Sequence, residues 1–168
     1  MQADALQRYG SLFAEMKSRF DRRLPVCDGL LCKQGFYMNS VVLKLQKACW
    51  TNDHMDVLKN ESGIFFSIWV NEQTAGKNRV NYNIHALKLR HLKGYSITSR
   101  EFAEDFRKQF ASFQNSWPNV SLKYGPLTLI QGWIEVNADN AEGEISFLME
   151  RFEEVCPIID RLLELRRR

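Results

Sequence analysis

Apolar residues recur with a helical period at both ends of the chain. In residues 4–24 they are spaced three or four apart and predict a helix with one apolar stripe, made of Leu6, Tyr9, Phe13, Met16 and Phe20. Pro25 is expected to end this helix. From residue 141 to the C-terminus the same spacing predicts a long helix, with a stripe of Ile145, Leu148, Phe152, Val155, Ile159 and Leu162. Pro157 lies inside it and is expected to kink it or to begin a second helix.

The middle of the chain shows the alternation that is typical of strands. Residues 36–50 alternate, whereas residues 64–70 are apolar on both faces, as in a central strand that is covered on both sides. Residues 71–78 are polar and contain a glycine, which predicts a long hairpin loop before a third strand. Two further β segments, 120–124 and 127–136, are separated by a Gly-Pro pair that forbids a continuous ladder.

A helix is predicted between the third strand and the last two β segments. Thr98 and Glu101 have the spacing of a capping box, and the buried stripe that follows is Phe102, Phe106, Phe110 and Phe113. The eight residues at 71–78 are too few for a crossover, so the strands within residues 36–92 are expected to be antiparallel.

We therefore expect an α+β fold that forms one domain over residues 1–168. An antiparallel or mixed five-stranded sheet would pack with the N-terminal, middle and long C-terminal helices. The length of 168 residues, the hydrophobic fraction of 45% and the charged fraction of 26% agree with a single globular domain.

The third strand changes its pattern part of the way along. Apolar residues occupy the even positions from Val80 to Ala86 and then the odd positions from Leu87 onward. A strand over the whole stretch would be unusually long, so we expect a β-bulge or a bend near Ala86 and Leu87.

The same strand carries a row of polar side chains that defines a candidate ligand site. If Ile68 lies opposite Tyr82 on the core face, the other face brings together Phe65, Ser67, Trp69, Asn81, Asn83 and His85. Aromatic walls with neutral hydrogen-bonding groups are typical of a small-ligand or peptide site. The same pattern also fits a solvated outer face that a helix partly covers.

The net charge of +3 is unevenly distributed. Residues 77–108 contain eight basic and three acidic groups. Within this region Lys88, Arg90, Lys93 and Arg100 form a candidate phosphate-binding surface. The alternative is a charged, solvated edge that prevents strands from aggregating.

Few residues suggest catalysis or metal binding. His54 has Asp53 and Asp56 beside it and could form a loop dyad, and His85 has amide neighbours. The cysteines, Cys27, Cys32, Cys49 and Cys156, are widely spaced, so we expect free thiols, no metal site and no cofactor.

The leading hypothesis is a non-catalytic binding or interaction module that uses the sheet face and the terminal helices. Nucleic-acid association through residues 77–108, and an enzyme acting through His85 or His54, are the alternatives. No apolar run approaches ~18 residues and no secretory signal pattern is visible, so we expect a cytoplasmic protein without membrane association.

The C-terminal helix also suggests self-association. Met149, Cys156 and Leu163 lie one heptad apart beside its main stripe and make the apolar arc wider than one neighbour needs. The main stripes of the two terminal helices are expected to pack on the sheet or against each other within the chain. For the additional arc we hypothesise burial in a homodimer.

Overall fold

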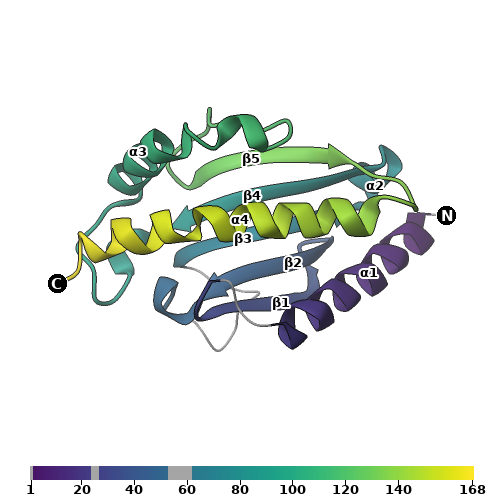
Figure 1. Cartoon of the computed structure of the whole chain (residues 1–168), viewed down its shortest axis with the longest axis horizontal. Helices are drawn as coiled ribbons and strands as arrows, with labels where there is room; N and C mark the ends of the chain where they lie inside the picture. The colour runs from purple at the N-terminus through teal and green to yellow at the C-terminus, as the bar shows by residue number, and fades with distance from the viewer. Residues whose placement is uncertain (1, 24–26, 53–61) are drawn as a thin grey trace.

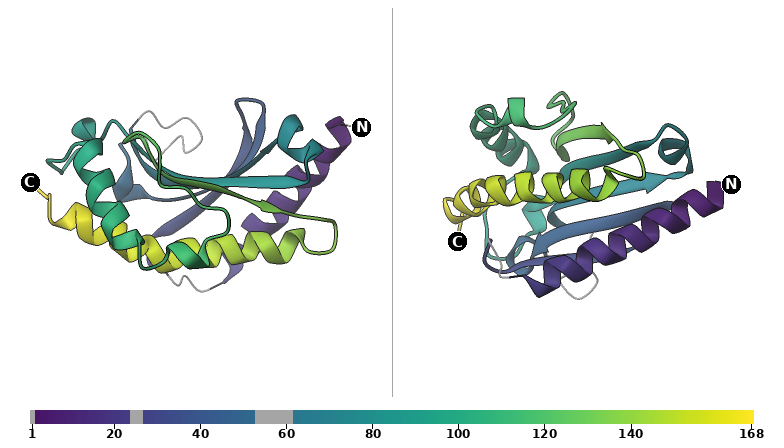
Figure 2. Two further views of the ribbon diagram at one scale, coloured as in Figure 1. Left: turned by 90° about the horizontal axis from the view of Figure 1, so that it is seen from above. Right: turned by 45° about the vertical axis from the view of Figure 1, so that its right-hand side comes forward.

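Five consecutive antiparallel strands form one sheet, and the long helices pack on one of its faces (Figures 1 and 2). The computed structural model describes residues 2–23, 27–52 and 62–168. The strands are β1 (Leu30–Tyr37), β2 (Ser40–Lys47), β3 (Gly63–Asn71), β4 (Arg79–Leu87) and β5 (Thr128–Glu135), in that order across the sheet. The helices are α1 (Gln2–Arg22), α2 (Glu72–Gly76), α3 (Ser99–Phe110) and α4 (Ala141–Glu164), with short 3-10 turns η1 (Ala48–Trp50), η2 (Leu89–His91) and η3 (Gln114–Ser116). The expected α+β fold, with an antiparallel sheet and N-terminal, middle and C-terminal helices, is confirmed.

The core lies between the sheet and the helices that cover it. Ile68 and Tyr82 face each other there, and both are fully buried. The ring of Phe66 stacks on that of Phe152 from α4, with 4.6 Å between centroids. Burial of one such side chain contributes roughly 1.5–3 kcal/mol, so the apolar stripe of α4 holds this helix on the sheet.

One of the five strands differs from expectation. β1 was not predicted from the sequence. Its segment contains turn residues, and Lys33, Gln34 and Gly35 do not alternate in polarity. Met38 and Asn39 join it to β2 with φ values of 50° and 62°, the positive values that a tight two-residue hairpin requires. Residues 120–124, by contrast, do not form a strand and contribute one isolated bridge, from Ser121 to Gln131.

The change of pattern after Ala86 marks the end of a strand. β4 stops at Leu87, Lys88 adopts a left-handed conformation with φ of 46°, and η2 then turns Leu89 into the core. The register shift in the sheet lies slightly earlier, between Ile84 and His85 where β4 pairs with β5.

α4 continues through Pro157 as one helix, so a second helix does not begin there (Figure 2). A proline inside a helix removes one backbone hydrogen bond. The neighbouring Cys156 and Ile158 are buried, and their packing keeps the chain helical at this point.

The additional apolar arc of α4 is covered within the chain. Met149, Cys156 and Leu163 are 4%, 0% and 1% exposed. The homodimer expected from these residues therefore loses its premise, because they are not available to a second molecule.

Two cysteines that we expected to be free form a disulfide. Cys27, which follows α1, is bonded to Cys156 of α4, whereas Cys32 and Cys49 are free thiols. The two partners are 129 residues apart, and only the packing of α4 on the sheet brings them together. Disulfides are typical of oxidising compartments, so this pair does not support the expected cytoplasmic location. None of the described helices combines the length and apolar character that crossing a membrane requires.

Gly132 of β5 is predicted to be essential for core packing. The ring of Tyr82 crosses over it, and a Cβ at this position would lie 2.5 Å from Cζ of Tyr82. We expect Gly132→Ala to lower the free energy of unfolding by roughly 1–3 kcal/mol, because a buried ring must move. Gly143→Ala in α4, where a Cβ meets no atom within 4 Å, is the matched control and should stabilise by up to about 1 kcal/mol. Urea unfolding measures both, and equal effects would contradict the role of the Tyr82 contact.

Candidate functional site

The sheet face opposite α1 and α4 carries the predicted ligand site. β3 and β4 pair in the expected register, with Phe65 opposite His85, Ser67 opposite Asn83 and Trp69 opposite Asn81. Because opposite residues share a face, all six lie on the side that the long helices leave uncovered (Figure 2).

A cavity of about 540 Å3 opens on this face. It takes residues from β2, β3, β4 and β5 and from the β1–β2 hairpin. Its wall is made of Tyr37, Met38, Ser40, Val42, Lys44, Phe65, Ser67, Trp69, Asn71, Asn83, His85, Leu87 and Gln131. Five of the six predicted residues line it, and Asn81 lies outside, beside Trp133 of β5. The pocket is of the size and mixed polarity that small-ligand sites have.

A band of polar side chains crosses the floor of this pocket. Lys44, Ser67, Asn83 and Gln131 lie directly opposite one another on four neighbouring strands. Lys44, Ser67 and Asn83 are only 3–5% exposed, and the Ser67 hydroxyl donates a hydrogen bond to Oδ1 of Asn83. Burying polar groups is costly unless they are hydrogen-bonded, and the bond between Ser67 and Asn83 offsets that cost. The paired strands hold the two side chains in place.

Aromatic and apolar side chains stand on both sides of the polar band. On one side the Phe65 ring lies 4.0 Å from Nζ of Lys44 and 5.3 Å from the His85 ring. On the other side Val42 and Trp69 lie opposite each other on β2 and β3. A flat apolar group could therefore contact a wall while polar atoms at its edge reach the band.

The β1–β2 hairpin also contributes to the pocket, which the sequence pattern did not predict. Tyr37 and Met38 reach the pocket from its turn, and Met38 is 78% exposed. A non-glycine residue at positive φ costs of order 1–3 kcal/mol and is found preferentially at binding sites. The pair Met38-Asn39 lacks the usual glycine of such turns, so nothing in the sequence identified the hairpin.

The hydrogen bonds of His85 select one tautomer of its neutral ring. Its Nδ1 lies 3.2 Å from the carbonyl oxygen of Leu127 and 3.2 Å from the hydroxyl of Thr128. A carbonyl can only accept, so Nδ1 carries the proton and Nε2 remains as the acceptor of the ring. Burial lowers the pKa of His85 below its ordinary value of 6.5, and the positive charge of Lys44 acts in the same direction.

The described residues offer no catalytic partner to a histidine. No acidic side chain is among the described residues that line the pocket, and His85 is oriented by a backbone carbonyl and a hydroxyl. His54 and its neighbours Asp53 and Asp56 lie outside the described residues. His85 therefore has no acidic partner among the described lining residues, and a role for His54 stays a prediction.

One group of possible metal ligands occurs in the described part of the chain. The ligand atoms of Cys27, Cys156 and Asp160 lie within 4.8 Å of one another. The two sulfurs are bonded to each other, and Asp160 accepts hydrogen bonds from Lys47 and Trp50. These three side chains therefore already have structural partners within the protein.

Six of the eight basic residues of the 77–108 region lie near the two ends of β4. Lys77 and Arg79 lie at its start, and the Arg79 guanidinium stacks 3.8 Å from the Trp133 ring. The predicted phosphate-binding residues Lys88, Arg90, Lys93 and Arg100 are exposed beyond its other end. A strand of nine residues separates the two groups by roughly 25–30 Å.

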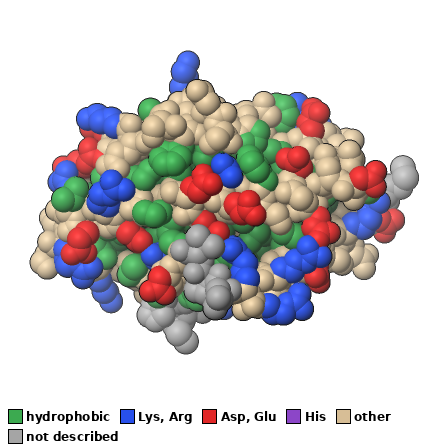
Figure 3. Space-filling model, in the orientation of Figure 1, with side chains coloured by type: hydrophobic (Ala, Val, Ile, Leu, Met, Phe, Trp, Pro, Cys, Tyr) green, Lys and Arg blue, Asp and Glu red, His purple; other side chains and the backbone are tan. Residues whose placement is uncertain are grey.

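Arg107, another basic residue of this region, serves the fold. Its guanidinium donates to the carbonyl oxygens of Tyr124, Gly125, Thr128 and Leu129, and burial lowers its pKa. On the side covered by α1 and α4, basic and acidic side chains are interspersed (Figure 3). Among the described residues, neither the basic side chains near β4 nor those on the side covered by α1 and α4 form one continuous basic surface.

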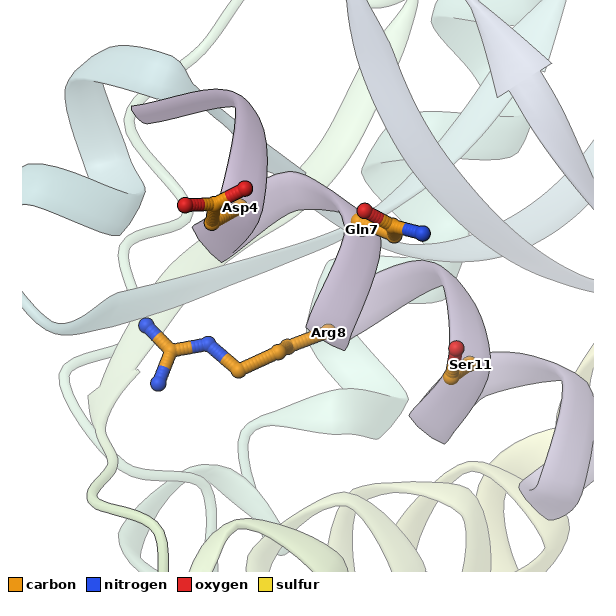
Figure 4. A pocket seen from close by; sticks show the side chains of 4 residues that line it. All are labelled: Asp4, Gln7, Arg8 and Ser11. Carbon is orange, nitrogen blue, oxygen red and sulfur yellow. The ribbon is translucent and has the colours of Figure 1, made fainter. Parts of the chain in front are cut away.

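A second, wider depression of about 630 Å3 lies along α1 (Figure 4). Asp4, Gln7, Arg8 and Ser11 line it from successive turns of the same helix, and all four are exposed. The described residues that line it are all polar, so they offer a ligand little beyond solvated polar groups.

No known protein family matches this chain, and neither curated proteins nor solved structures show detectable similarity to it. Its function must therefore be inferred from the residues of the site.

The protonation of His85 is expected to make stability depend on pH. The pKa of His85 is lowered in the folded state, so the unfolded chain takes up this proton first as the pH falls. The free energy of unfolding should be highest above pH 6.5 and should decrease as the pH falls from 6.5 toward the lowered pKa of the folded state. His85→Asn, whose amide can still donate to Leu127, should remove this part of the decrease.

Urea unfolding of both proteins at about pH 8 and about pH 5.5 tests this expectation. The two proteins differ only at residue 85, so the difference between the two pH profiles isolates His85. Identical profiles would show that His85 is freely solvated.

Proposed function

We propose that this protein is a non-catalytic binding module whose site is the pocket on the open sheet face. The single observation that carries the proposal is the band of buried polar side chains between aromatic and apolar walls, centred on Ser67 and Asn83. Packing of the fold does not require polar groups in this place, because the apolar core lies on the opposite face. Preorganised polar groups in a concave apolar site are what fixes the orientation of a small ligand.

The expected ligand is a small molecule with a flat apolar part and uncharged polar atoms at one edge. Its apolar part would lie against Trp69 or Phe65, and its polar edge would reach Asn83 and Gln131. Nε2 of His85 would accept a hydrogen bond from an N–H or O–H of the ligand. The terminal helices, which were also expected to take part in binding, have their apolar stripes in the core or packed against it.

Nucleic-acid association is the weaker alternative. It would need a continuous track of basic side chains along a backbone of phosphates. The exposed group of Lys88, Arg90, Lys93 and Arg100 lies at one end of β4 only, and Lys77 and Arg79 lie at the other.

Benzamide is a suitable probe of the proposed site, because it joins a flat ring to an amide. We expect it to bind with a dissociation constant on the order of 1 mM and to shift the NMR signals of Ser67, Trp69 and Asn83. Trp69→Ala should weaken this binding about tenfold, since it removes an aromatic wall. The positively charged benzamidine should bind less tightly than benzamide, because no acidic side chain among the described lining residues compensates its desolvation.

Trp133→Ala is the matched control for Trp69→Ala. Trp133 lies on the same sheet face at a comparable partial exposure, but it packs against Arg79 outside the pocket. This variant should bind benzamide as the unmodified chain does. Shifts that map to another surface, or equal loss in the two variants, would reject the pocket as the site.

A further inference from the structure

The two edges of the sheet, β5 and β1, differ in how many of their outward backbone groups are hydrogen-bonded. On β5 three of the outward carbonyl groups, those of Leu129, Gln131 and Trp133, each have a donor from the same chain. Arg107 donates to Leu129, the backbone N–H of Ser121 donates to Gln131, and the Asn119 side chain donates to Trp133. These contacts prevent another strand from pairing with this edge.

The β1 edge has no such cover within the described part of the chain. The tight turn pairs Tyr37 with Ser40, so the odd residues of β1 bond to β2 and the even residues point their N–H and C=O groups outward. The outward groups belong to Leu30, Cys32, Gln34 and Phe36. The N–H of Leu30 donates to the carbonyl of Cys27, and no described residue hydrogen-bonds to the backbone of the other three. An open edge of this kind is a template for a further strand.

Exposed apolar side chains gather at the same edge. Among the described residues seven large apolar side chains are exposed, and four of them belong to β1 and its turn: Leu31, Phe36, Tyr37 and Met38. Phe36, at 63% exposure, lies on the helix-covered side of the sheet, and Leu31 and Tyr37 lie on the open side. A cavity of about 340 Å3 lies at the opposite end of the same edge, between α1 and β1, and its apolar wall is Phe20, Leu30, Leu31 and Cys32.

These features are complementary to themselves under a twofold rotation. If Gln34 pairs with Gln34 of a second copy, Phe36 of each copy lies opposite Cys32 of the other, at the mouth of the cavity beside Phe20. The same register places Leu31 of one copy opposite Tyr37 of the other on the open face. An isologous contact needs this kind of match, in which one patch supplies both the projection and its recess.

The charge of Lys33 selects this register from its neighbours. Only the even residues of β1 can exchange hydrogen bonds across the new edge. In each neighbouring register, β1 of the second copy is therefore displaced by two residues along the strand. The shift that pairs Cys32 with Gln34 places Lys33 opposite Lys33 of the second copy, and directly opposed like charges are destabilising. The shift that pairs Gln34 with Phe36 separates Leu31 from Tyr37.

We infer that the β1 edge is an interface for a second copy of this chain, which pairs antiparallel to β1 with Gln34 on the twofold axis. The two sheets then form one continuous sheet of ten strands. Leu31 of each copy packs beside Tyr37 of the other, next to the pocket on the open face. This interface is independent of the ligand proposed for that pocket.

Analytical ultracentrifugation over a concentration series tests the interface. The unmodified chain should show a monomer–dimer equilibrium. Phe36→Lys should raise the dissociation constant of the dimer by at least about tenfold, because symmetry removes the contact twice. Phe36 is exposed, so the variant should unfold at the same temperature as a dilute sample of the unmodified chain. Leu165→Lys, which changes an exposed apolar residue just beyond α4, is the matched control and should leave the equilibrium unchanged.

Cysteine cross-linking tests the register without relying on Phe36. In a chain that carries Cys32→Ala and Cys49→Ser, Gln34→Cys should give a covalent dimer on mild oxidation, since paired residues lie about 5.5 Å apart at Cα. Lys33→Cys in the same background should give much less. A monomer at every concentration, an effect of Leu165→Lys equal to that of Phe36→Lys, or preferential cross-linking through position 33 would overturn the inference.

Discussion

Antiparallel pairing between β3 and β4 assigns each residue of these strands to one of two faces. Ile68 and Tyr82 pair on the helix side, and Ser67 and Asn83 pair on the open side. A shift by one residue would exchange the faces and would place the amides in the core. The stacked contact of Phe66 with Phe152 prevents that shift, because it holds the even residues of β3 under α4. Core packing and the candidate site are therefore two consequences of one register.

Coverage of the sheet by the long helices on one side gives the two faces different chemistry. On the covered side Tyr82 passes over Gly132 and donates to the Pro118 carbonyl, which satisfies its hydroxyl in an apolar layer. On the open side Ser67 and Asn83 satisfy each other inside a pocket. A polar pair held in this way would lose little conformational entropy if a ligand bound to it.

The same chain protects one sheet edge and leaves the other open. α3 and the segment that follows it supply Arg107, Asn119 and Ser121 to β5, whereas β1 is joined to the rest of the sheet through β2 alone. The broad apolar arc of α4 is used inside the molecule, where Cys156 is bonded to Cys27. The geometric case for self-association consequently lies at the β1 edge.

Much of the architecture was determined by the sequence, because periodicity is a local property. The stripe of Phe102, Phe106 and Phe110, the cap at Thr98 and the alternation in β3 and β4 each depend on neighbouring residues, and the structure has them as expected. The same alternation predicted which residues share a face once Ile68 was assumed to lie opposite Tyr82, and the structure has this pairing and brings five of the six candidate residues into one pocket.

Tertiary structure alone decided the features that join distant residues. The Cys27–Cys156 bond, the reach of Met38 into the pocket and the burial of Met149 depend on how elements far apart in sequence pack. β1 was hidden because an edge strand packs little and tolerates Lys33, Gln34 and Gly35, so its sequence need not alternate. Local pattern fixes which face a side chain takes, but the partner of that face is set by the free energy of the whole packed chain.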